Sequence, residues 1–143
     1  MFNLTTGNVQ FCRSNFTLCA DITPKIIEEN LADVIFGREK IGTRFLRYMI
    51  WGDIEPHEYI YADISFSDDK LQHIRLLPQY QSTTASEKQV YCMDLLAAQN
   101  LTHAWHQKYF SDDKMDFSWG TVTYFKGGDP IYSPPCILIK FKR

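Results

Sequence analysis

The feature that most constrains the fold is a β-hairpin pattern in residues 58–80. Apolar and polar residues alternate along its first half, which is typical of a strand with one buried face. The apolar positions are Ile60, Ala62, Ile64 and Phe66. A polar turn follows at residues 67–70, where aspartate side chains can accept hydrogen bonds from the local backbone. The chain then returns through Leu71 and Ile74, whose out-of-phase spacing predicts a β-bulge after the turn.

The residues before this hairpin predict a helix and a further strand. The helix is expected over residues 24–36, because Thr23 can cap its first turn and Pro24 suits the first helical position. Gly37 is placed to end it. Residues 44–51 are rich in aromatic and β-branched side chains, which favours a strand. A short link joins this strand to the hairpin, so a meander of three antiparallel strands is expected.

The residues after the hairpin predict a long helix and a second hairpin. Residues 86–89 read Ser-Glu-Lys-Gln, a capping box, and apolar residues recur at helical spacing to about Tyr109. Residues 111–114 are expected to form a polar loop. Strands are then predicted over residues 119–125 and 136–141.

These elements, with one or two short strands before residue 22, predict an α+β fold. We expect an antiparallel sheet of about five to six strands with two main helices packed on it, in a single domain spanning residues 1–143. The first residues lack the basic and apolar regions of a secretory signal, and the sequence has no run of about 18 apolar residues. A cytoplasmic protein with reduced cysteines is the expectation.

The residues that could carry catalysis or bind a metal are scattered along the sequence. His103 and His106 lie three apart on a predicted helix, but a third ligand is not evident, so ordinary histidines are favoured and no metal or cofactor is expected. The four cysteines are too widely spaced for a zinc ribbon or a redox pair. They are Cys12, Cys19, Cys92 and Cys136. Asp68 and Asp69 form an acidic pair, but in a turn rather than a cleft. We therefore expect a binding protein and not an enzyme.

A candidate binding surface lies on the hairpin. The formal net charge of -2 argues against a nucleic-acid binder with a dominant positive field. Residues 52–69 contain six acidic residues and no Lys or Arg, and tyrosines beside acids suit recognition of a basic protein surface. The predicted partner-binding residues are Tyr59, Tyr61, Asp63, Asp68, Asp69 and His73. The alternatives are a solvated acidic face, and tyrosines that pack across strands or beneath a helix.

Several segments carry a resemblance to a known class of proteins. They are residues 18–24, the strand and turn at 64–71 with 73–76 after it, the helical segment 103–105, and the run 117–122. The most distinctive run is Ser-Trp-Gly-Thr-Val at 118–122, in which Trp119 can seal the end of the core and Gly120 can allow a bulge or a close backbone contact. In their order these segments resemble small bacterial immunity proteins encoded beside polymorphic or contact-dependent growth-inhibition toxins.

The resemblance implies a cytoplasmic protein that binds a cognate toxin domain and neutralises it by blocking its active site or substrate surface. It implies a protein partner, with no nucleic acid and no membrane. The weakly acidic total charge departs from the strongly acidic inhibitors of basic nucleases, so the resemblance does not indicate the toxin's activity. A small enzyme with an unrecognised pocket, and a structural or adaptor subunit of a larger assembly, are the alternatives.

Overall fold

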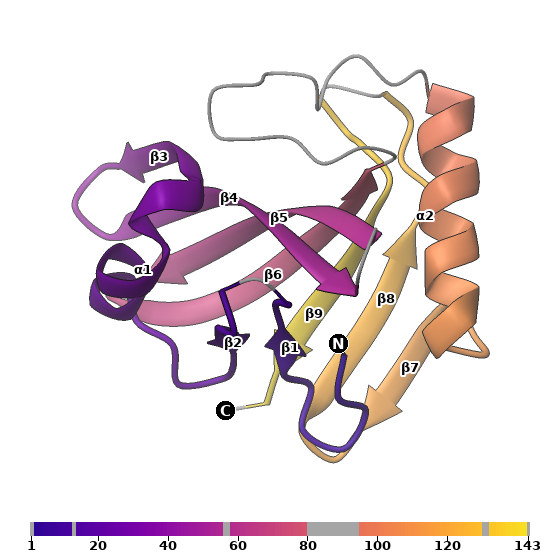
Figure 1. Ribbon diagram of the computed structural model, residues 1–143, viewed down its shortest axis with the longest axis horizontal. Coiled ribbons are helices and arrows are strands. Elements are labelled where there is room, and N and C mark those ends of the chain that lie inside the picture. Colours follow the sequence, from indigo (N-terminus) through magenta and orange to yellow (C-terminus); the bar gives the residue numbers. More distant parts are fainter. Residues whose placement is uncertain (1, 13, 56–57, 80–94, 130–131, 143) are drawn as a thin grey trace.

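The centre of the protein is a seven-stranded antiparallel sheet with strand order β3-β4-β5-β6-β9-β8-β7 (Figure 1). This computed structural model describes residues 2–12, 14–55, 58–79, 95–129 and 132–142. The sheet consists of β3 (Ile35–Ile41), β4 (Phe45–Glu55), β5 (Glu58–Ser67), β6 (Lys70–Gln79), β7 (Lys114–Phe117), β8 (Gly120–Phe125) and β9 (Cys136–Phe141). A separate two-stranded sheet pairs β1 (Val9–Gln10) with β2 (Thr17–Leu18). The helices are α1 (Pro24–Leu31), the 3₁₀ turn η1 (Ala32–Val34) and α2 (Leu95–Tyr109).

The predicted hairpin is confirmed as β5 and β6, the last two strands of a four-strand meander that starts at β3. Its turn consists of Asp68 and Asp69, which adopt φ of 51° and 62°. Two successive positive φ angles give a turn whose twist matches that of the strands, and aspartate tolerates this conformation well. The predicted bulge is also present, because Ser65 and the residue after it pair with His73 and Leu71, leaving one residue of β6 between them.

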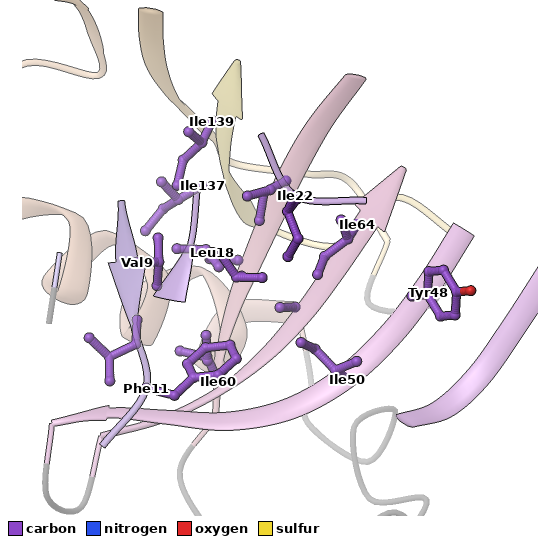
Figure 2. Close-up of a cluster of buried hydrophobic side chains, with 14 of the residues drawn as sticks. Val9, Phe11, Leu18, Ile22, Tyr48, Ile50, Ile60, Ile64, Ile137 and Ile139 are labelled. Atoms are coloured by element: carbon purple, nitrogen blue, oxygen red, sulfur yellow. The ribbon is translucent and has the colours of Figure 1, made fainter. Parts of the chain in front are cut away.

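The hydrophobic core covers one face of the sheet, which we call the covered face. The alternating apolar residues of β5 all lie in it, as predicted. Figure 2 shows Val9 and Leu18 of the small sheet gathered with Ile137 and Ile139 of β9. The helices add Ile27 and Leu31 from α1 and Trp105 from α2 to the same core. The two helices and the small sheet therefore lie on the same side of the large sheet (Figure 1).

The first helix is shorter than predicted, and the strand β3 takes the place of its last part. The helix α1 has the expected cap, in which the Thr23 hydroxyl accepts a hydrogen bond from the Ile26 amide at 3.3 Å. It ends at Leu31, and residues 35–41 then pair with β4. Residue Gly37 does not end the helix, because it lies within this strand against Met49. The interstrand pairing overrides a local helical pattern.

A second unpredicted strand is β7, which begins inside the expected polar loop and pairs with β8. The strands β3 and β7 form the two edges of the sheet and explain why it has seven strands and not five to six. The predicted terminal hairpin is confirmed as β8 and β9, and Ile139 of β9 also pairs with Ile74 of β6. The helix α2 ends at Tyr109 as predicted, whereas its predicted capping box at residues 86–89 lies outside the described residues. In the described ranges, no helix is both long and apolar enough to cross a membrane.

Candidate functional site

The opposite face of the large sheet, which we call the open face, carries neither α1 nor α2, but a smaller apolar cluster is buried on part of it and packs against Val34 of η1. The members of this cluster are Trp51, Tyr61, Leu77 and Cys136. The described helices and the small sheet contribute their buried side chains to the core on the covered face instead. Strand register assigns the alternate residues to the open face. Across β3 to β6 and β9 they include Glu39, Ile41, Phe45, Arg47, Met49, Trp51, Tyr59, Tyr61, Asp63, Ser65, His73, Arg75, Leu77, Cys136, Leu138 and Lys140.

A buried carboxylate lies at the centre of the open face. The Asp63 side chain is 1% exposed, and those of Arg47 and Arg75 are each 31% exposed. Arg47 donates from Nε and Nη2 to the two carboxylate oxygens of Asp63, both at 2.6 Å. Arg75 donates to Oδ2 from Nε at 3.1 Å and also from Nη2. The charge of Asp63 is therefore satisfied by two arginines that it holds in place.

Strand pairing explains this arrangement. Arg75 of β6 lies directly opposite Asp63 of β5. Arg47 of β4 is opposite Ser65, which makes it the diagonal neighbour of Asp63 on the other side. Both positions are within reach of a long side chain across an antiparallel pair. The bidentate hydrogen bond from Arg47 to Asp63 raises the pKa of the Arg47 guanidinium further above its ordinary value.

His73 lies next to this ion pair and within a ring of charged side chains. Burial lowers its pKa, the nearby cations Arg75, Lys140 and Arg47 lower it further, and Asp63 opposes them. The imidazole is therefore neutral at pH 7. Within the described residues, Arg75 Nη1 and the Lys140 ammonium have no hydrogen-bond or ion-pair partner. No described residue occupies these two groups, and each can donate to a bound anion.

A cavity of about 340 Å³ opens beside Arg47 at the end of the open face. Its lining residues are Glu39, Ile41, Phe45, Leu46, Arg47, Ser65, Phe66, Gln72 and His73. Ile41 and Phe45 lie opposite each other on β3 and β4 and are 56% and 51% exposed, although both are large and apolar. Glu39 forms an ion pair with Arg47 at 3.4 Å. The cavity thus combines exposed apolar side chains with an arginine held by carboxylates.

The six residues predicted to bind a partner occupy different settings. Four of them, Tyr59, Tyr61, Asp63 and His73, share the open face, as the alternation of the hairpin predicts. Tyr61 is only 3% exposed, because its ring packs against Phe36 and Trp51 at centroid distances of 4.8 and 5.7 Å. Asp68 and Asp69 form the exposed turn. Neither Tyr61 nor Asp63 therefore offers its side chain to a partner.

The acidic surface expected over residues 52–69 is largely buried or paired. Asp53 is 8% exposed, and Glu58 pairs with Lys108 of α2. Arg44 bonds to Asp68 at 2.9 Å and lowers the pKa of its carboxyl group. The residues that sequence reasoning missed are Arg47, Arg75 and Lys140, which supply exposed positive charge around Asp63. Alternation along each strand places these three side chains on the open face, but this can be recognised only once the strand register is known.

The other predicted candidates do not form a site in the described part of the chain. His106 is 1% exposed on the covered face and stacks near Phe110 and Tyr124, with its Nε2 unpartnered. Among the described residues, no group of three or more His, Cys, Asp or Glu side chains could hold a metal ion. Cys136 is a buried apolar filler, as predicted, and burial raises the pKa of its thiol to about 11. Cys92 lies outside the described residues.

Comparisons of the chain with protein-family models, curated proteins and solved structures each gave no match.

Proposed function

We propose that this protein binds another protein through the open face of its sheet and acts as an immunity protein that neutralises a toxin domain. The observation that supports this most is the pairing of exposed apolar side chains, Ile41 and Phe45, with fixed arginines on a face that neither α1 nor α2 covers. Arginine and aromatic side chains beside a pocket are typical of the positions that dominate protein interfaces.

The way in which the arginines are held favours binding. Asp63 fixes the side chains of Arg47 and Arg75 before any partner arrives. Less conformational entropy is then lost when they contact a partner. A rigid sheet face of this kind can cover an active site or substrate surface without a chemical step. The immunity role itself is supported by the resemblance of residues 64–71, 73–76 and 117–122 to such proteins.

The proposal is tested by purifying the tagged chain from its native host and identifying what remains bound after a salt wash. We expect a stoichiometric protein partner that arrests growth when produced alone and does not when this chain is produced with it. Recovery of the chain alone, while its genomic neighbours are expressed, would contradict the proposal.

A second candidate is a small enzyme or a protein that binds a small molecule, and the cavity favours it. His73, which burial keeps neutral at pH 7, lines the cavity with Ser65 and Arg47. Polar groups with shifted pKa values that meet in a pocket are candidates for a functional site. A small acid that raises the melting temperature of the wild-type protein but not of His73→Gln would support this function over the first.

A further inference from the structure

The polarity of the open face is the opposite of what the acidic hairpin sequence suggests. Three cations, Arg47, Arg75 and Lys140, surround His73, and the carboxylate among them, Asp63, is buried. Glu39 adds one exposed negative charge at the cavity. Three cations against two carboxylates leave a net charge of +1 around His73, and because Asp63 is buried, the charged groups that a partner can contact there are mainly cations.

Strand register places the two donors, Arg75 and Lys140, next to a residue of the cavity wall, His73. His73 lines the cavity and lies beside Ile74, which pairs with Ile139, so Lys140 is its neighbour on β9. Arg75 is the next open-face residue of β6 after His73. His73 forms one wall of the cavity. An apolar group in the cavity would therefore have Arg75 and Lys140 near it on that side.

We infer that the open face recognises a partner segment in which an aromatic or aliphatic side chain is flanked by carboxylates. This inference rests on the proposed function, in that the partner is a protein. The apolar side chain of the partner enters the cavity between Ile41 and Phe45 and is thereby removed from contact with water. The carboxylates accept hydrogen bonds from Arg75 Nη1 and the Lys140 ammonium.

A protein segment fits this surface better than a nucleic acid. The chain has a formal net charge of -2, and Glu39 lies at the cavity. Binding to the phosphate backbone of a nucleic acid needs many cations arranged along its length, whereas this site offers three cations beside an apolar cavity. A short acidic segment with one apolar anchor matches both the charge and the cavity.

The test uses ¹⁵N-labelled full chain and three blocked tripeptide amides as probes. The sequences are Glu-Phe-Asp, its charge-reversed counterpart Lys-Phe-Lys, and Glu-Ala-Asp, which lacks the anchor. We expect Glu-Phe-Asp to shift the backbone amides of Phe45, Ser65 and His73 in a saturable way, with a dissociation constant of about 0.1 to 10 mM. The other two peptides are expected to bind at least about five-fold more weakly.

Two variants and a matched control locate the binding. Lys140→Gln removes a free cation, and Phe45→Ser removes one apolar wall; each is expected to weaken Glu-Phe-Asp binding about three- to ten-fold. Lys114→Gln is the control, because Lys114 is also exposed on the open face but lies on the edge strand β7. It is expected to leave the affinity unchanged.

Three results would overturn the inference. They are no saturable shift up to about 10 mM Glu-Phe-Asp, equal binding of the Lys-Phe-Lys peptide, and stronger shifts of the same amides by a single-stranded oligonucleotide. Each of these results is measured on the isolated protein, without its native partner. If the peptide binds as expected but no protein co-purifies with the chain, the immunity proposal fails and the chemistry of the site stands.

Discussion

At the scale of single residues, Asp63 organises the open face, since it is the buried acceptor for both Arg47 and Arg75. Replacing it by asparagine keeps its size and removes its charge. We expect Asp63→Asn to lower the free energy of unfolding by about 2–4 kcal/mol, because two partly buried guanidinium groups lose their common partner. Urea denaturation measured by circular dichroism checks this.

The matched control is Asp68→Asn at the tip of the same hairpin. Asp68 also pairs with an arginine, Arg44, but both side chains are exposed, at 57% and 66%. Exposed ion pairs contribute little to stability, so this variant is expected to unfold like the wild type. Equal effects of the two substitutions would show that Asp63 does not hold the open face together.

A second prediction at this scale concerns His106, whose pKa is lowered by burial. His103 lowers this pKa further, and Asp113 opposes the shift. The unfolded chain therefore binds a proton more readily than the folded chain does. The free energy of unfolding is expected to fall as the pH decreases below about 6.5, the ordinary pKa of histidine.

Urea titrations at a pH above and a pH below this value measure the fall. His106→Gln cannot titrate and is expected to reduce the difference between the two free energies of unfolding. His73 has a lowered pKa as well, so His73→Gln gives the share that arises on the open face. An unchanged pH dependence in His106→Gln would contradict the assignment.

At the scale of elements, the pairing of β8 with β9 depends on Gly120. A Cβ atom at this position would collide with the Lys140 carbonyl oxygen and approach the Phe141 Cα to 2.9 Å. We expect Gly120→Ala to destabilise the protein by about 1–3 kcal/mol, because the colliding atoms belong to the backbone and can move only if the strands separate. Gly128→Ala is the control, since a Cβ there meets nothing within 4 Å. Similar melting temperatures for the two variants would contradict this role.

The elements also show what sequence can predict and why. The β5–β6 hairpin follows from local signals, namely the alternation, the polar turn and the phase change that marks the bulge. The strand β3 does not, since residues 35–41 become a strand by pairing with β4. The site divides in the same way. The shared face of Tyr59, Asp63 and His73 is local information, whereas the burial of Asp63 depends on two arginines brought by neighbouring strands.

At the scale of the whole molecule, the sheet separates two tasks. The covered face carries the two described helices and the main core, which hold the strands in register. The open face carries a smaller buried apolar cluster beside its charged groups and exposed apolar side chains. A chain with a formal net charge of -2 thus presents a positive region around His73. This arrangement leads to the claim that the partner contributes carboxylates and an apolar side chain.

The measurement that tests this claim most directly is the affinity of the co-purified partner for two charge-reversal variants, by calorimetry at low salt. Lys140→Glu reverses a charge on the open face, and Asp69→Lys reverses one on the exposed turn; both residues are exposed, so the fold is expected to be retained. The account predicts that Lys140→Glu weakens binding at least about ten-fold and that Asp69→Lys has little effect. The reverse result would place the contact on the acidic turn and contradict the account.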